Sequence, residues 1–230
     1  MIFRKTYILY FLFWYTTSTF SQVNKLLVVN YKKYLTEIRA DSNNRLIGIK
    51  ELIPDVQIDL RYATTNNFTK KILYPPQARA YVRLPVAKAL VAVQQQLKKY
   101  RLGLKIYDAY RPYAVSKKIW LLVQDERYAA NPANGSGHNK GLSVDITLID
   151  LSTGVELPMP TAFDNFSDTA HLTFIQLPKH ILENRTLLRT IMEHNGFKGL
   201  STEWWHYTFI TSESFSVLDL SFKEIASIFK

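Results

Sequence analysis

The chain has 230 residues, of which 47% are apolar and 21% charged, a balance that is typical of globular proteins and excludes a disordered chain. It contains no cysteine, which excludes disulfides, thiolate zinc clusters and cysteine nucleophiles, so a metal ion would have to be held by His, Asp or Glu. The net charge of +10 comes from lysines and arginines that never run longer than a pair, and this scatter favours a basic surface over a nucleic-acid groove.

The first 21 residues have the organisation of a secretory signal peptide. Arg4 and Lys5 precede an apolar stretch over 7–15, and a polar stretch follows that ends in the small residue Ser21. The apolar stretch is much shorter than the roughly 20 residues that span a bilayer. We expect cleavage after Ser21 and an exported protein, periplasmic or secreted, with no stable membrane insertion after cleavage. The alternatives are an uncleaved anchor or a buried strand of the domain.

The remaining residues, 22–230, are expected to form one domain, because no repeat or linker divides them. Residues 22–45 are polar and mixed, and are expected to form a lead-in that packs late or stays mobile. Residues 56–60 alternate between apolar and polar, which predicts a half-buried strand. Over 84–100, apolar residues recur at steps of three and four with Pro85 in the first turn, which predicts an amphipathic helix.

Helices and strands follow in mixed order along the rest of the chain. Because they do not alternate regularly, the pattern predicts an α+β fold in which helices flank a central, largely antiparallel sheet. The expected elements are strands over 104–107, 143–149 and 205–210, a helix that starts after Pro112 and runs through Leu122, and a helix over 183–194.

A first cluster of unusual residues lies in the segment 136–148. His138 leaves a glycine-rich loop, and Asp145 lies within an aliphatic strand, between Val144 and Ile146. Alternation places Asp145 on the face opposite to these two neighbours. A carboxylate within an apolar strand needs a partner, because burial of an unpaired charge is costly, and a metal ion would be such a partner.

In a second cluster, two tryptophans separate Glu203 from His206. In a strand over 205–210, the tryptophan next to His206 would lie on the other face, and Glu203 would lie just ahead of the strand. His138, Asp145 and His206 provide two imidazoles and one carboxylate, a ligand set of catalytic zinc sites in which a fourth position is open to water. Glu203 is the candidate for the base that takes a proton from that water.

Each of these residues has a purely structural interpretation when it is taken alone. His138 could be a surface residue, Asp145 could pair with Arg111 or a lysine, and Glu203 could cap the edge of an aromatic core. The metal-site hypothesis is favoured because the ligands, the base and a water-excluding aromatic wall occur together. The helix-borne His-Glu-x-x-His motif is absent, so a different zinc scaffold is expected.

Further motifs occur in a recognisable order and spacing. They are Tyr-Ala-Thr at Tyr62, Asp-x-Tyr-Arg-Pro at Asp108, Ser-x-His-x-x-Gly-x-x-x-Asp at Ser136, Phe-Asp at Phe163 and Glu-Trp-Trp-His at Glu203. Over about residues 45–210 the chain thereby resembles the D-alanyl-D-alanine dipeptidases, the VanX-type zinc peptidases. The His-x6-Asp and Glu-x-x-His motifs are shared with the wider D,D-carboxypeptidases, whereas the doubled tryptophan, Tyr-Ala-Thr and Phe-Asp favour the dipeptidase branch.

The resemblance implies a zinc enzyme that hydrolyses D-Ala-D-Ala to two D-Ala in cell-wall peptide turnover. One zinc ion per chain would be bound by His138, Asp145 and His206. Glu203 would activate the zinc-bound water and later act as the acid.

Four further residues have roles implied by the resemblance. Arg111 would stabilise the oxyanion beside zinc, with a structural ion pair as its alternative. Asp164 would bind the substrate ammonium group, unless it is only a turn residue. Ser136 would hydrogen-bond the substrate and Tyr62 would line the pocket, although a structural role is favoured for both.

Two other functions are compatible with these motifs. One is a peptidoglycan D,D- or L,D-carboxypeptidase or endopeptidase on the same scaffold, and the other is a non-catalytic zinc-containing wall-binding module. Glu203 and Arg111 argue against the module, because a binder needs neither a base nor an oxyanion donor. The expected partner is a small dipeptide released from peptidoglycan, no nucleic-acid partner is expected, and the sequence does not specify an oligomeric state.

Overall fold

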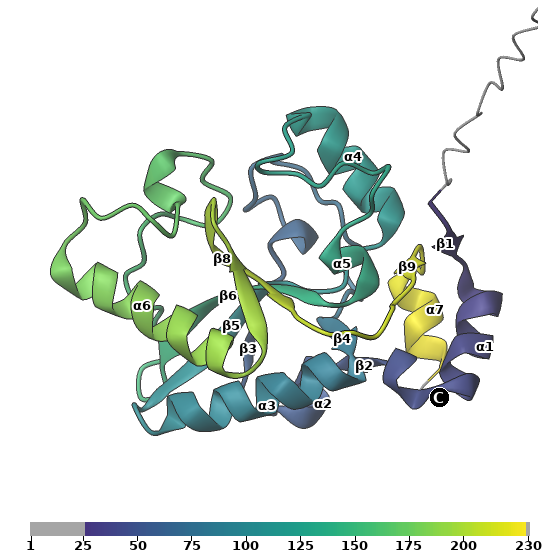
Figure 1. Cartoon of the computed structure of the whole chain (residues 1–230), viewed down its shortest axis with the longest axis horizontal. Helices are drawn as coiled ribbons and strands as arrows, with labels where there is room; N and C mark the ends of the chain where they lie inside the picture. Colours follow the sequence, from purple (N-terminus) through teal and green to yellow (C-terminus); the bar gives the residue numbers. More distant parts are fainter. Residues whose placement is uncertain (1–25, 229–230) are drawn as a thin grey trace, which may run out of the picture.

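The computed structural model describes residues 26–228 of the chain (Figure 1). The predicted signal peptide at 1–21 therefore lies outside the described residues. The helices are α1 (Tyr31–Ala40), α2 (Ile49–Leu52), α3 (Leu84–Lys98), α4 (Tyr113–Val123), α5 (Gly137–Lys140), α6 (Lys179–His194) and α7 (Phe222–Ser227), and short 3-10 helices occupy Ser42–Asn44, Arg61–Ala63 and Asp168–Ala170.

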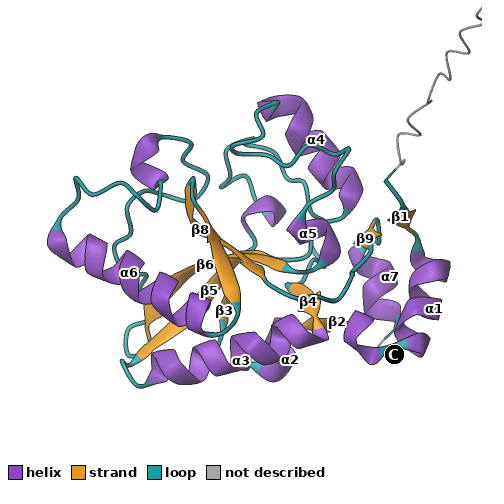
Figure 2. Cartoon of the chain, in the orientation of Figure 1, coloured by secondary structure: helices purple, strands orange, loops and turns teal. Residues whose placement is uncertain are grey.

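A five-stranded sheet in the order β3-β5-β6-β8-β7 lies at the centre of the molecule (Figure 2). β3 is parallel to β5, and the other three pairs are antiparallel, which confirms the predicted α+β fold with a largely antiparallel sheet. Two small sheets pair β1 with β9 and β2 with β4. The strands are β1 (Val28–Val29), β2 (Leu46–Gly48), β3 (Gln57–Ile58), β4 (Tyr81–Arg83), β5 (Leu102–Asp108), β6 (Ser143–Asp150), β7 (Phe197–Leu200), β8 (Glu203–Phe209) and β9 (Val217–Leu218).

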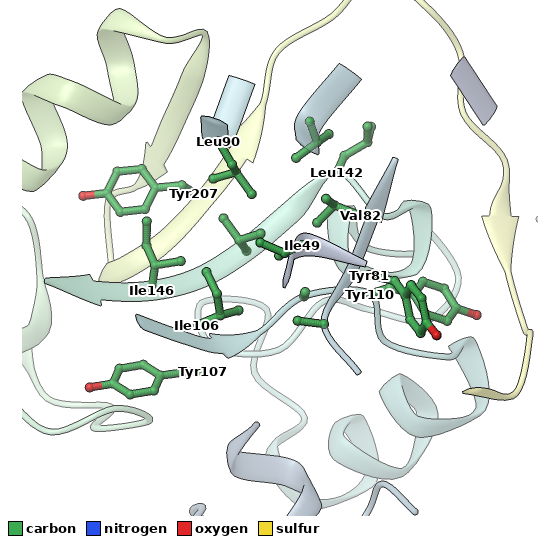
Figure 3. Close-up of a cluster of buried hydrophobic side chains, with 14 of the residues drawn as sticks. Ile49, Tyr81, Val82, Leu90, Ile106, Tyr107, Tyr110, Leu142, Ile146 and Tyr207 are labelled. Atoms are coloured by element: carbon green, nitrogen blue, oxygen red, sulfur yellow. The ribbon is translucent and has the colours of Figure 1, made fainter. Parts of the chain in front are cut away.

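Helices α3 and α6 cover one face of this sheet (Figure 1). Leu90 of α3 is fully buried, and Figure 3 shows it together with Ile146 and Tyr207 of the sheet. Figure 3 also shows Tyr107 on the opposite side of β5 from Ile106, as alternation along a strand requires. The face away from the two helices is therefore free to carry polar side chains.

The central strand β6 is covered on both faces. Val144 and Ile146 are fully buried, and Asp145 between them is only 3% exposed. Burial on both sides means that the carboxylate predicted to stand out from an apolar strand lies inside the molecule, where it needs compensating partners.

Several element boundaries differ from the sequence-based expectation. The strand expected over 56–60 is reduced to Gln57–Ile58. α6 begins at Lys179 and not at 183, because Pro178 occupies the N-cap position, where its missing N–H costs no helical hydrogen bond. β8 begins at Glu203, so the candidate base is the first residue of the strand.

The expected polar lead-in is packed where it is described. Asn30 caps α1 by accepting a hydrogen bond from the Lys33 N–H, and Tyr34 of α1 is 1% exposed. The Tyr34 hydroxyl accepts a 2.7 Å hydrogen bond from the Leu46 N–H, and α1 lies beside α7 (Figure 1). Because α1 has a single buried aromatic residue, its sequence has little apolar periodicity from which a packed helix could be predicted.

Within the described residues no helix has the length and apolar character needed to cross a membrane.

Candidate metal centre and active site

Three side chains from three elements converge on the face of the sheet opposite α3 and α6. Asp145 of β6 lies directly opposite His206 of β8 in the antiparallel register, and His138 comes from α5. One potential ligand atom from each lies within 4.8 Å of the others, and this is the only such group of three among residues 26–228. The three residues that the sequence analysis proposed as one ligand set therefore lie together in the structure.

Close packing of α5 against β6 positions His138. A Cβ atom added at Gly137 would lie 1.9 Å from Ser143 Oγ and 3.1 Å from Ser143 Cβ, so a larger residue would require the Ser143 hydroxyl to rotate or the helix to shift. Ser136 caps α5 by accepting a hydrogen bond from the Asn139 N–H, which gives this hydroxyl the structural role that was its favoured alternative. Ser136 also lines the cleft described below.

Register shifts occur on both sides of this site. The pairing of β5 with β6 shifts between Ile106 and Asp108, and the pairing of β7 with β8 shifts between Gly199 and Leu200. Such bulges re-aim side chains and are frequent next to active sites. As a result Trp205 lines the same cleft as His206, which strict alternation along β8 did not predict.

Each histidine of the cluster has a second hydrogen bond that fixes its orientation. His138 Nδ1 lies 2.7 Å from the Ala109 carbonyl oxygen, and His206 Nε2 lies 3.1 Å from Thr208 Oγ1. Because a carbonyl oxygen only accepts, a neutral His138 carries its proton on Nδ1 and directs the lone pair of Nε2 inward. Contacts of this kind orient metal-bound imidazoles.

The inward atoms fit a metal ion. His138 Nε2 lies 3.4 Å from Asp145 Oδ1 and 3.2 Å from His206 Nδ1, and Asp145 Oδ1 lies 3.0 Å from His206 Nδ1. Two imidazole nitrogens and a carboxylate oxygen therefore face one another, close enough to share one cation. Two histidines and one carboxylate are a donor set of catalytic zinc sites.

Electrostatics favours the ligand-competent forms of Asp145 and His206. Burial opposes ionisation of Asp145, but the charge and hydrogen bond of His138, together with His206, hold the pKa of this carboxyl well below its usual range. Burial lowers the pKa of His206, so its imidazole is neutral at physiological pH. An ionised carboxylate and a neutral imidazole are the forms that bind a divalent metal ion.

Glu203 lies beside the three ligands. Its side chain is buried, and Glu203 Oε2 lies 4.0 Å from His206 Nδ1. Burial raises the pKa of Glu203 well above its usual value, and the nearby carboxylates of Asp145 and Asp164 raise it further. A bound cation would oppose this rise. A buried carboxyl group at this position can both accept and return a proton.

Arg111 is aimed at the ligands by side chains that the sequence analysis did not assign. Its Nε and Nη2 atoms donate hydrogen bonds of 2.9 and 2.7 Å to Asp108 Oδ2, and Nη2 lies 3.8 Å from Asp145 Oδ2. Asp108 is fully buried and also accepts a 2.7 Å hydrogen bond from the Tyr74 hydroxyl. Arg111 therefore forms the ion pair considered as its alternative and also reaches the cluster. The position of Asp108 three residues before Arg111 could have suggested this ion pair from the sequence. No sequence signal marked Tyr74.

Asp164 and Tyr62 meet on the other side of Arg111. The Tyr62 hydroxyl donates a 3.3 Å hydrogen bond to Asp164 Oδ1, and the Arg111 guanidinium lies 5.0 Å from the centre of the Tyr62 ring. Asp164 has a left-handed backbone with a φ of 58°, and its Oδ2 atom is buried without a hydrogen-bond partner. Burial, reinforced by the charge of Asp145, raises the pKa of Asp164 to about 7. A cationic ligand group would satisfy the unpaired oxygen.

These side chains line one cleft of about 290 Å³. The segment 126–130 forms part of its wall. Tyr62 packs behind Asp164 and is not itself part of the lining. The predicted site residues that line the cleft are Arg111, Ser136, His138, Asp145, Asp164, Glu203 and His206.

The arrangement belongs to the metal-dependent peptidases as a class, since it combines ligands for one ion with separate acid–base and charge-stabilising side chains. The chain is a member of the Peptidase_M15 family of D-Ala-D-Ala dipeptidases, whose family model matches residues 42–227. This family assignment agrees with the resemblance that the sequence motifs carry.

Two curated relatives are similar over most of the chain. The D-alanyl-D-alanine dipeptidase of Escherichia coli K12 is 34% identical over 173 residues, which cover 75% of this chain and 89% of the relative. The D-alanyl-D-alanine dipeptidase of Enterococcus faecium is 31% identical over 178 residues, which cover 69% of this chain and 88% of the relative. Among solved structures, a Zn(II) complex of the D,D-pentapeptidase VanY is a distant neighbour, with 14% identity, a TM-score of 0.38 and coverage of 64% of this chain and 84% of that chain.

Proposed function

We propose that this protein is a zinc-dependent dipeptidase that hydrolyses D-Ala-D-Ala to two molecules of D-Ala, with one zinc ion per chain. The observation that carries the proposal is the convergence of His138, Asp145 and His206 within 4.8 Å, with Glu203 4.0 Å from His206 Nδ1. Family membership supports the type of reaction. The two bacterial relatives described above are both named for hydrolysis of this dipeptide.

Glu203 is the proposed general base and acid. Zinc held by the three ligands would supply Lewis-acid polarisation of the attacking water and the substrate carbonyl. Glu203 accepts the proton of the water as the new C–O bond forms, and then gives it to the amine of the departing D-Ala. Trp205 lies beside Glu203 in the cleft wall and limits access of bulk water.

Arg111 is the proposed donor to the oxygen on which negative charge develops. Its Nη2 atom is 3.8 Å from Asp145 Oδ2, so the guanidinium borders the place where the scissile carbonyl would lie. The hydrogen bonds to Asp108 fix the guanidinium before the reaction begins. A preorganised donor of this kind needs no reorientation at the transition state.

Asp164 is the proposed partner of the substrate ammonium group. Its Oδ2 atom is buried and unpaired, whereas Oδ1 accepts from Tyr62, so one oxygen remains free for a cation. A free dipeptide carries that cation one residue before the scissile bond. A longer peptide has a neutral amide there and would leave the carboxylate desolvated and unpaired.

The test is release of D-Ala from D-Ala-D-Ala by the purified zinc-loaded protein, with L-Ala-L-Ala and intact muropeptides as competing substrates. Glu203→Ala should bind zinc as the wild type does and lose turnover by about 10²–10⁴-fold, the usual contribution of acid–base catalysis. Retention of more than about a tenth of the wild-type rate would mean that another group moves the proton. Hydrolysis of muropeptides in preference to the free dipeptide would favour the carboxypeptidase or endopeptidase alternative.

We also propose that the protein is exported and acts on dipeptide released during cell-wall turnover. The proposal rests on the composition of residues 1–21, with Arg4 and Lys5 ahead of the apolar stretch. Cell fractionation should find the protein outside the cytoplasm with Gln22 as its first residue. Recovery of the full-length chain from the cytoplasm would contradict it.

A further inference from the structure

A second cavity, of about 460 Å³, lies close to the active-site cleft. Thr147 of β6 lines it, two residues beyond Asp145 and therefore on the same face of the sheet. Tyr107 of β5 also lines it. The cavity reaches the surface at its rim, where Pro158 is exposed.

The two spaces are separated by a thin aromatic wall. Phe163 lines the second cavity and its neighbour Asp164 lines the cleft, and in the same way Trp204 lines the cavity and Trp205 lines the cleft. The Phe163 ring is at the centre of the wall, with its centroid 5.5 Å from that of Trp205 and 5.0 Å from that of Tyr107.

The second cavity has polar groups suited to an uncharged chain. Thr147 is 0% exposed, so its hydroxyl lies beneath the floor of the cavity and does not face an occupant. The charged groups near the rim already satisfy one another. Arg61 Nε lies 2.9 Å from Asp59 Oδ2, and Glu156 accepts hydrogen bonds of 2.9 Å from Lys105 Nζ and 2.6 Å from the Tyr107 hydroxyl. An occupant therefore meets no unpaired charge at the rim. An amide or acyl group matches this chemistry better than an ion does.

We propose that Phe163 is a specificity-determining residue, whose ring separates the cleft from a cavity able to hold the acyl or peptide extension on the amino side of a longer substrate. The inference rests on the proposed dipeptidase function. With the substrate ammonium group at Asp164, an extension directed toward the second cavity would meet the Phe163 ring, because Asp164 lines the cleft and Phe163 lines the cavity. Dipeptide selectivity then has two causes, the charge of Asp164 and the steric barrier of Phe163.

The test compares kcat/KM for N-acetyl-D-Ala-D-Ala with kcat/KM for free D-Ala-D-Ala. In Phe163→Ala the ratio should rise at least about tenfold over wild type, equivalent to about 1.4 kcal/mol. Adding Asp164→Asn should raise it further, because the unpaired carboxylate then no longer opposes the acetylated substrate.

Phe166→Ala is the matched control. It removes a ring of equal size from the same segment, but Phe166 packs against Phe68 and Tyr128 and lines neither space. Its ratio should stay at the wild-type value. If Phe163→Ala fails to fold, Phe163→Leu provides a smaller opening for the same comparison.

A non-kinetic measurement gives an independent readout. In a Glu203→Ala background, tryptophan fluorescence reports binding, because Trp205 contacts both the cleft and Phe163. Binding of N-acetyl-D-Ala-D-Ala should tighten with Phe163→Ala and not with Phe166→Ala. An unchanged ratio in Phe163→Ala and Phe163→Leu, or an equal rise in Phe166→Ala, would overturn the inference. Wild-type protein that does not cleave free D-Ala-D-Ala would instead overturn the proposed function.

Discussion

Arg111 reaches the metal ligands because two other side chains hold it in place. Asp108 accepts two hydrogen bonds from its guanidinium and a third from Tyr74, and all of Asp108 is buried. Burial would lower the pKa of Arg111, but the charge of Asp108 keeps it well above the usual value. The arginine therefore remains charged within the protein. The family resemblance implied the role of Arg111, whereas Tyr74 contributes from a loop 34 residues before Asp108 and has no local signature.

Asp108→Asn should reduce kcat by about 10²–10³-fold, the usual effect of losing one transition-state donor, because Arg111 loses the carboxylate that orients it. Zinc content should stay at one per chain, and KM should change much less than kcat. Steady-state kinetics with metal analysis checks both. Asp55→Asn is the control, since Asp55 pairs with Lys98 on the surface, where ion pairs contribute about 0–1 kcal/mol. A fall in kcat no larger than that of the control would show that Asp108 does not position Arg111 for catalysis.

The elements of the fold differ in how well the sequence predicted them. α3 and β6 have clear apolar patterns because the packing of α3 on the sheet that contains β6 requires apolar residues on both. Both elements were predicted to within two residues at each end. The two-residue strands β1 and β9 are too short to have a period. α1 carries a single buried residue, Tyr34, so its polar sequence gave no sign that it packs against the domain.

The candidate metal ligands were predictable, whereas the bulges that arrange the wall around them were not. Residue type and spacing identify His138, Asp145 and His206 from the sequence alone. The shifts at Ile106/Asp108 and Gly199/Leu200 depend on pairing between strands far apart in the chain. Strict alternation therefore placed Trp205 on the wrong side of β8.

The contact between α5 and β6 provides a test at the scale of elements. Gly137→Ala would place a Cβ atom 1.9 Å from Ser143 Oγ and 3.1 Å from Ser143 Cβ. Rotation of the Ser143 hydroxyl relieves the first contact but not the second, so we expect α5 to shift slightly and to take His138 with it. We expect weaker zinc binding and a loss of about 1–3 kcal/mol in unfolding free energy, as is typical of overpacking. Competition with a chelator and denaturant titration measure the two effects.

Two further variants make the Gly137→Ala result specific. Ser143→Gly in the same chain removes the clashing atoms and should restore zinc affinity. Gly154→Ala strains a left-handed residue with a φ of 71° in a distant turn, so it should cost stability and leave zinc affinity unchanged. Zinc affinity in Gly137→Ala equal to that of the wild type would show that α5 does not position His138.

At the scale of the whole molecule, the proposed zinc ion joins segments that are distant in the sequence. His138, Asp145 and His206 come from α5, β6 and β8, and the chain has no disulfide to connect them. A ligand that binds only the folded state stabilises that state by linkage. The fold and the metal site are therefore expected to lose stability together.

Removal of zinc should lower Tm. At a free zinc concentration one hundred times Kd, linkage gives about 2.7 kcal/mol. For a chain of this size that corresponds to roughly 5–10 °C in Tm. Thermal unfolding with and without a chelator measures the shift, and His206→Ala, which lacks one ligand, should show no effect of the chelator. Equal chelator sensitivity in His206→Ala and wild type would mean that the metal binds elsewhere.

The central claim is that a buried carboxylate at Asp164 makes this metal centre a dipeptidase, and kcat/KM for free and N-acetylated D-Ala-D-Ala tests it most directly. A hydrogen bond to a charged group contributes about 1.5–3 kcal/mol, and Asp164 can take up a proton when the ammonium group is absent, so at neutral pH the wild type should favour the free dipeptide by roughly one to two orders of magnitude. Asp164→Asn, which tolerates the φ of 58°, should largely abolish that preference, whereas Asp168→Asn at an exposed position of the same segment should retain it. Equal cleavage of both substrates by the wild-type protein would contradict the account and favour a carboxypeptidase.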